Sequence, residues 1–354
     1  MIPVPFIEYL NVRIKGYHSR LFTRDMYDDL LNGDNLAAIT TFFLNHPEYS
    51  NDIEQALETL PEREGLERGV TNHFARCISD ILHMAHGKSL NHFKIVLHSF
   101  DLKNLRTIIL AYQNGLPFHK VRDMIIPCGS LDRDILSILL NAPDLQAMAH
   151  ILSTRYPIGA EALNRALRET TEHEPVLHLI NRVELNFYYN ILKFLDQKDA
   201  NMKIIKDIFR LEIDMKNIIS ALKFVWEGEK PVQDNGDIFT HGGNIATQLL
   251  YEISGAKALD EAFEMIESTA FHAAVEKGII YYAETGFLHE MERFFEEVFI
   301  RKTQFYKRFH PFGIGVFLGY VWCKFIELTN LRTIINGIAF RAGTGQIRKG
   351  LIYV

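Results

Sequence analysis

A nine-residue segment that recurs within the chain constrains the fold more than any other feature. Residues 101–109 return as residues 327–335 with seven identical positions, and a weaker copy begins at residue 214. The copies share one asparagine, which recurs at intervals of 113 residues: Asn104, Asn217 and Asn330. Equal spacing of this kind is the signature of a repeat architecture, so the sequence predicts one structural unit used three times.

The third copy ends at the C-terminus before its downstream half can appear. That half lies at the other end of the chain, because residues 24–36 repeat residues 133–145 at an offset of 109. We therefore expect the two termini to complete one shared repeat and to close three sectors into a single funnel or socket, in place of an open solenoid. The expected sectors are approximately 1–50 with 301–354, 66–160, and 180–275.

Hydrophobic periodicity predicts an all-α fold. In residues 89–114 the apolar positions follow a spacing of three and four, with Ser89 as the expected N-cap and Asn114-Gly115 as the expected stop. We find no convincing run of alternating β-branched residues.

Each repeated asparagine falls on the apolar stripe of its helix. A buried amide needs hydrogen-bond partners, so we expect Asn104, Asn217 and Asn330 to bond to backbone of the neighbouring helix and to fix packing register. Arg106 and Arg332 point away from that stripe. They fit either an interface with another protein or ion pairs between sectors.

Charge is unevenly distributed along the 354 residues. The net charge is −6, which gives no general electrostatic reason to bind nucleic acid, but residues 301–354 carry nine Lys or Arg against one acid. This segment is therefore +8 and the preceding residues are −14, which favours a charge match with a partner or within the chain, unless the segment is simply a solvated helix face. The candidate interface residues are Arg106, Arg332, Arg341 and Arg348.

No catalytic or cofactor motif is convincing. Gly87-Lys88-Ser89 resembles the end of a phosphate-binding loop, but Leu82 occupies the position of its first glycine. His83 and His86 lie one turn apart without a third metal ligand in a recognisable spacing. The sequence therefore predicts no enzyme, no cofactor, no metal and no direct nucleotide binding.

Targeting and membrane signals are also absent from the sequence. The N-terminus lacks a secretory pattern, and the best apolar span, residues 312–321, soon meets Lys324. Three widely separated cysteines fit a reducing compartment. We expect a soluble or peripheral protein with no transmembrane segment of its own.

Three blocks resemble the C subunits of archaeal and bacterial A/V-type ATPases, the counterparts of the d subunits of eukaryotic vacuolar ATPases. Residues 9–27 are similar to the opening Y-x-N-x-R block, and residues 184–189 to a conserved helix with Asn186 and compressed spacing as departures. Residues 309–334 resemble the H-P-x-x-x-G-x-x-x-G-Y block that runs into N-L-R-x-I. This chain departs at Phe325, where the family often has Glu, and lacks a usual Lys after Gly337.

The resemblance implies a non-catalytic rotor component of the central stalk, without cofactors. Such a component sits on the cytoplasmic side of the membrane proteolipid ring (c or K type), receives the central axle (D and F type subunits) and transmits torque for ATP-coupled proton or sodium transport. Two other interpretations stay open: a helical-repeat adaptor of another complex, and an enzyme with a hidden site.

Overall fold

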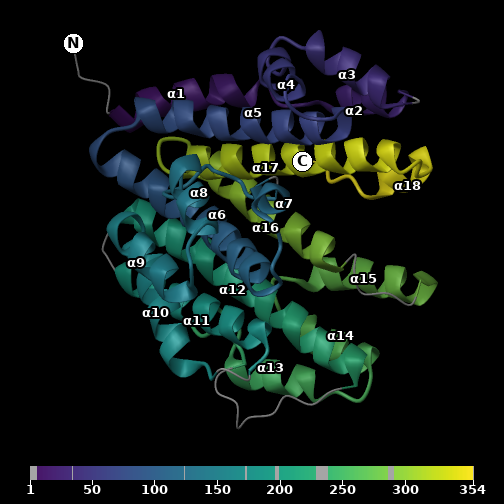
Figure 1. Ribbon diagram of the computed structural model, residues 1–354. Helices are drawn as coiled ribbons and strands as arrows, with labels where there is room; N and C mark the ends of the chain where they lie inside the picture. Colours follow the sequence, from purple (N-terminus) through teal and green to yellow (C-terminus); the bar gives the residue numbers. More distant parts are fainter. Residues whose placement is uncertain are drawn as a thin grey trace. The chain divides into compact units, whose positions relative to one another are not determined.

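A computed structural model of the chain describes residues 6–33, 35–122, 124–171, 174–195, 199–228, 238–285 and 291–353. Every regular element within these residues is a helix, which confirms the all-α prediction (Figure 1). The chain divides into two compact units, Met1–Asn141 with Tyr306–Val354, and Ala142–Phe305. The first unit therefore combines both ends of the chain.

The first unit contains the following helices and the end of α16: α1 (Phe6–His18), α2 (Arg24–Leu31), α3 (Leu36–Leu44), α4 (Ser50–Leu57), α5 (Glu62–Met84), α6 (Gly87–Gln113), α7 (Phe118–Arg122), α8 (Arg133–Leu140), α17 (Gly315–Ala339) and α18 (Thr344–Lys349). The second unit contains α9 (Leu145–Arg155), α10 (Pro157–Glu169), α11 (Val176–Phe194), α12 (Ala200–Glu227), α13 (Thr247–Ser254), α14 (Leu259–Ile266), α15 (His272–Thr285) and most of α16 (Met291–Phe309).

One succession of helix lengths recurs along the chain. The three longest helices, α6, α12 and α17, carry the repeated asparagines. An eight-residue helix follows α6 as α8 and follows α12 as α13, and the eight-residue helix near the N-terminus is α2. Helices this short are marginal alone, so caps and burial must hold them. Asp132 caps α8 by accepting from Ile135 N at 2.9 Å, and Thr23 caps α2.

The beginning of α6 differs from the expected N-cap. The helix starts at Gly87 with His86 in extended conformation before it, so Ser89 lies inside the first turn and is buried. Its end agrees with the sequence, since Asn114 is the C-cap and Gly115 has φ 60°. Gly87-Lys88-Ser89 is therefore helix and not a loop that could surround a phosphate.

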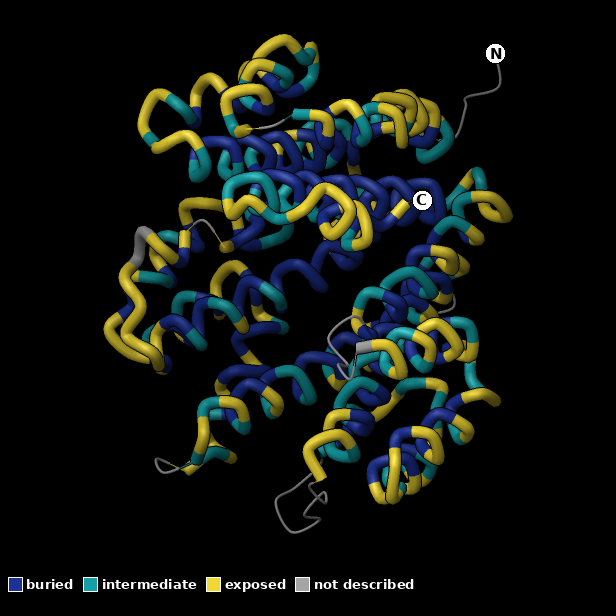
Figure 2. The backbone as a smooth tube through the Cα atoms, turned by 90° about the vertical axis from the view of Figure 1, so that its right-hand side faces the viewer, coloured by how far each residue is buried: buried dark blue, intermediate teal, exposed yellow. Residues whose placement is uncertain are grey.

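Helix α17 forms the centre of the first unit. Seventeen of its 25 residues are buried, as expected for a helix that is apolar on all sides, and it packs against α1 and α5. Figure 2 shows buried residues along the helices beside the C-terminus. Gly315 allows a close approach, because a Cβ there would lie 2.3 Å from the carbonyl oxygen of Tyr306. The small residues of this segment thus serve helix packing.

Candidate functional site

The three repeated asparagines make the same pair of hydrogen bonds. Asn104 Nδ2 donates to the carbonyl oxygen of Ile126 at 2.8 Å, and its Oδ1 accepts from Ile126 N at 2.8 Å. Asn217 bonds in the same way to Thr240, and Asn330 to Ile352. Each partner lies 22 or 23 residues downstream.

These partners differ from the expected ones in one respect. Ile126, Thr240 and Ile352 belong to irregular backbone, and not to a neighbouring helix. Irregular backbone has unpaired N–H and C=O groups, which a helix interior does not offer, so an amide side chain can satisfy both groups of one residue.

A carboxylate three residues before each asparagine binds backbone further along the repeat. Asp101 accepts from Ser130 N at 2.9 Å and from Leu131 N at 3.0 Å, just before α8. Asp214 accepts from Asn244 N and Ile245 N, just before α13. Burial raises the pKa of Asp214, although these backbone bonds and Arg210 oppose the shift. We call each carboxylate with its asparagine a clamp.

The clamp of α17 joins the two ends of the chain. Glu327 Oε2 accepts from Phe22 N at 2.7 Å, just before α2, across 305 residues. Phe22 stands 109 residues before Leu131, which is the offset between the N-terminal and central copies. This is the contact that a repeat divided between the two termini requires.

Glycine beside the clamp is a signal that the sequence analysis missed. A Cβ on Gly129 would lie 2.2 Å from Asp101 Oδ1, and a Cβ on Gly243 would lie 2.1 Å from Asp214 Oδ1. The carboxylates themselves were also visible in the repeated segment, since each precedes its asparagine by three residues.

A buried ionic network surrounds Glu327. Tyr49 Oη and Lys324 Nζ both donate to Glu327 Oε1, and Lys324 Nζ also lies 3.2 Å from Tyr49 Oη. All three residues are at most 4% exposed. Burial, together with the adjacent Glu327 carboxylate, raises the pKa of Tyr49 well above its usual value. The network fastens the residue before α4 to α17.

A second buried group continues from Tyr49 into α5. The ring of His73 lies 3.8 Å from that of Tyr49, and its Nδ1 lies 3.2 Å from Asp52 Oδ2. Arg76 Nη2 also binds Asp52 Oδ2, at 2.7 Å. Burial lowers the pKa of His73 to about 4, against the opposing effect of the Asp52 hydrogen bond. Burial raises the pKa of Asp52, but the bonds from His73 and Arg76 outweigh it and lower the pKa overall.

The structure does not bring the four candidate interface arginines together. Arg332 is mostly enclosed, donates to Thr71 Oγ1 of α5 at 2.7 Å, and has its pKa lowered by burial. Arg348 lies 3.0 Å from Asp28 of α2. Arg106 on α6 and Arg341, which follows α17 with φ 58°, are exposed. Part of the positive segment is thus engaged inside the first unit.

Exposed aromatic side chains stand near both ends of α17. Phe312 precedes the helix and is 69% exposed, and Phe340 follows it and is 74% exposed. A helix of this length spans about 37 Å, so the two rings form separate surface features. Large exposed rings on a protein of this size are candidates for contact with partners.

Two of the sequence blocks that carry the ATPase resemblance contact each other. Asn11 Nδ2 on α1 lies 3.2 Å from the carbonyl oxygens of both Pro311 and Gly313. The departure at Phe325 has a local explanation, because Lys103 Nζ lies 4.4 Å from the centre of its ring. A cation–π contact thus occupies that position.

Comparison with known proteins gives a consistent result. The sequence model of the family described as ATP synthase (C/AC39) subunit matches residues 10–350. The A-type ATP synthase C subunit of Methanocaldococcus jannaschii is 20% identical over 347 residues, covering 97% of this chain and 86% of that protein. The corresponding protein of Haloferax volcanii is 24% identical, covering 93% and 92%. The V-type ATP synthase C subunit of Thermus thermophilus is 22% identical, covering 97% and 98%.

Proposed function

Because the chain belongs to the ATP synthase (C/AC39) subunit family, we propose that it is a non-catalytic rotor component in the central stalk of an A/V-type ATPase. It links the membrane proteolipid ring to the central axle subunits. It transmits torque between ATP turnover and proton or sodium transport. The family match over nearly the whole chain is the observation that carries this proposal.

The architecture of α17 supports a mechanical role. A part that transmits torque must resist shear, and dense packing of buried side chains provides that resistance. Helix α17 is buried along most of its length and is fastened to the N-terminal segment through Glu327. Forces applied near Phe312 and near Phe340 would pass along one continuous helix.

We also infer that the clamps define three sectors, with Asn104, Asn217 and Asn330 holding their register. The common hydrogen-bond pattern supports the proposed boundaries of approximately 1–50 with 301–354, 66–160 and 180–275. Closure of these sectors into a socket for the axle is part of the same proposal.

The proposed position is peripheral, on the cytoplasmic face of the membrane. None of the helices in the described part of the chain is both long and apolar enough to cross a bilayer. Contact with the ring would therefore use surface residues. We assign this contact to the exposed aromatic rings, with Arg106 and Arg341 as the remaining candidate arginines.

The test is to tag the chain in its native cell, extract membranes with mild detergent and identify the co-purifying proteins by mass spectrometry. We expect the proteolipid ring and the axle subunits. Recovery of the chain alone, with the ATPase intact in the same extract, would contradict the proposal and favour an adaptor or enzyme.

A matched pair of variants sharpens this test. Phe312→Ser and Phe340→Ser should each reduce recovery of one partner, whereas Ile280→Ser on α15, where the side chain is 59% exposed, should reduce neither. Equal losses in all three variants would count against the assigned contacts.

A further inference from the structure

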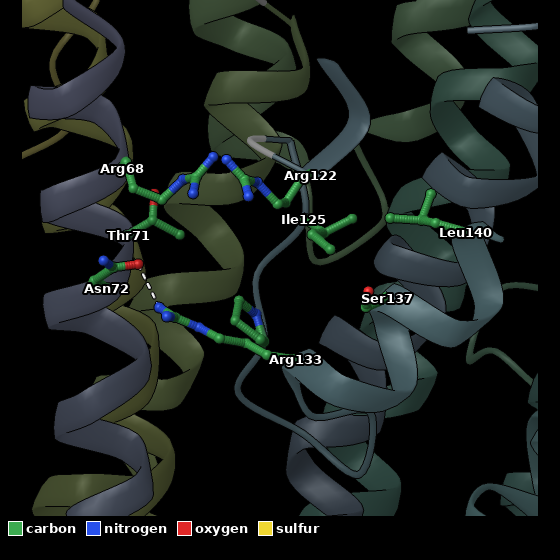
Figure 3. A pocket seen from close by; sticks show the side chains of 9 residues that line it. Arg68, Thr71, Asn72, Arg122, Ile125, Arg133, Ser137 and Leu140 are labelled. Carbon is green, nitrogen blue, oxygen red and sulfur yellow. Dashed lines mark hydrogen bonds between the residues drawn. The ribbon is translucent and has the colours of Figure 1, made fainter. Parts of the chain in front are cut away.

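A cavity in the first unit has three arginines and no carboxylate among the described residues that line it. Its volume is about 340 Å³, near the lower end for small-molecule sites. Arg68 comes from α5, Arg122 from the end of α7 and Arg133 from the start of α8. Figure 3 shows the guanidinium groups of Arg68 and Arg122 pointing toward each other. We call this cavity the arginine pocket; its polar wall is completed by Thr71, Asn72 and Ser137.

Like charges oppose one another in the arginine pocket. Burial, with the charges of Arg122 and Arg133, lowers the pKa of Arg68 to about 10. Arg133 donates to the neutral Oδ1 of Asn72, which supplies a hydrogen bond but no negative charge. Thr71 is buried and already accepts from Arg332, so a fourth guanidinium approaches the same wall.

The other repeat of the same unit shows how such arginines are neutralised internally. Arg122 corresponds to Arg348, which forms an ion pair with Asp28 at 3.0 Å. At the offset of 109, Asp28 corresponds to Ser137 in the wall of the arginine pocket. The carboxylate that pairs with the arginine in one repeat is therefore a hydroxyl in the other.

The second arginine follows the same rule. Arg133 corresponds to Arg24, whose guanidinium lies 5.0 Å from the centre of the Tyr353 ring. Tyr353 corresponds to Pro127, which also lines the arginine pocket. Both internal partners of the paired repeat are thus replaced where the cavity lies.

We propose that the arginine pocket binds a small anion with two phosphate groups, such as a diphosphate. Guanidinium groups bind phosphate oxygens in bidentate fashion, and three of them line this cavity. One phosphate group carries about −1.5 to −2 charges at neutral pH, so two groups balance three arginines better than one. This proposal is independent of the proposed rotor function.

The first experiment titrates the purified full-length chain with pyrophosphate by isothermal calorimetry at low salt. We expect saturable binding that is tighter than binding of inorganic phosphate and weaker at high salt. Arg122→Gln should weaken it about 10- to 100-fold, because a charge-assisted hydrogen bond is lost. The matched change in the paired repeat, Arg348→Gln, should leave binding unchanged.

A single substitution in the wall gives the sharper test. Ser137→Asp restores the carboxylate found at the equivalent position of the paired repeat, and should abolish binding. Ser137→Asn, of nearly the same size but neutral, should retain it. Circular dichroism checks that each variant folds; Arg122 is exposed, so Arg122→Gln decides the question if Ser137→Asp does not fold.

Vesicles distinguish the source of the phosphate groups. Flotation with phosphatidylcholine vesicles, with and without a bisphosphorylated inositol lipid, tests a lipid headgroup. Binding of pyrophosphate in solution indicates a free anion, and binding only to the phosphorylated vesicles indicates a lipid, provided that Ser137→Asp abolishes either. Absence of both, or equal binding by Ser137→Asp and wild type, would overturn the proposal.

Discussion

The clamps of α6 and α17 do the same task with different means. Asp101 is connected to its partners by continuous chain, and both of its oxygens accept from backbone N–H groups just before α8. Glu327 gives one oxygen to Phe22 N and the other to Tyr49 and Lys324. Where the chain is interrupted, a longer carboxylate and a buried ionic network replace covalent continuity. The comparison teaches that the junction of the termini is held by side chains alone.

The largest expected effect comes from removing the charge at that junction. Glu327→Gln leaves the Lys324 ammonium buried without its counter-charge, which costs about 3–5 kcal/mol of unfolding free energy. Asp101→Asn, the matched change on α6, leaves no buried lysine behind and should cost less. Urea denaturation of both variants measures the difference; equal losses would contradict the special role of the network.

Loss of an asparagine should come next. Asn104→Ala leaves the N–H and C=O groups of Ile126 unpaired, at about 1–3 kcal/mol each when buried, for a total of about 3 kcal/mol. Asn330→Ala should cost a similar amount, because its two bonds to Ile352 are the same. If only one of the two variants is destabilised, the clamps are not equivalent.

The network around Tyr49 should also make stability depend on pH. The folded-state pKa of His73 is lowered to about 4, so between pH 6.5 and 4 the unfolded chain binds the proton and the folded chain does not. Stability should therefore fall as pH drops through this window, by at most about 3 kcal/mol. Asp52, whose pKa is lowered in the fold, extends the loss below pH 4.

Thermal unfolding at several pH values checks this prediction. His73→Gln should flatten the profile between pH 6.5 and 4 while leaving the acid limb that belongs to Asp52. A profile that keeps its slope in the variant would assign the pH dependence to other groups.

The smallest expected effect concerns the space beside each carboxylate. Gly129→Ala would force a Cβ against Asp101 and cost about 1–3 kcal/mol. Arg20 occupies the corresponding position before Phe22, and its side chain is 58% exposed. Arg20→Ala should therefore change stability by less than about 1 kcal/mol. Chemical denaturation of the two variants compares them directly.

Much of the fold could be predicted because helical periodicity and repeats are local properties of the sequence. The spacing of Asn104, Asn217 and Asn330 placed three equivalent residues on long helices, and the resemblance of residues 309–334 indicated the family. The first turn of α6 was misplaced by two residues, because Ser89 is a common N-cap type but lies within the helix.

The candidate site was less predictable, since its contacts join distant segments. Nothing near Arg332 in the sequence indicates that it binds Thr71, which is 261 residues away. The arginine pocket likewise depends on how α5, α7 and α8 meet. The missing carboxylate at Ser137 has meaning only once the paired repeat is aligned with it through the clamps.

The junction at Glu327 also sets the order of events during synthesis. The second unit is continuous in sequence, so all of its residues have been made before α17 emerges. The first unit needs α17 to cover Tyr49 and to bind Phe22, and these residues are made at the start. At about 5–20 residues per second, the N-terminal helices wait on the order of 15–60 s for their partner. Their apolar faces are exposed during this interval, so the newly made N-terminal segment is where protection against aggregation is needed most.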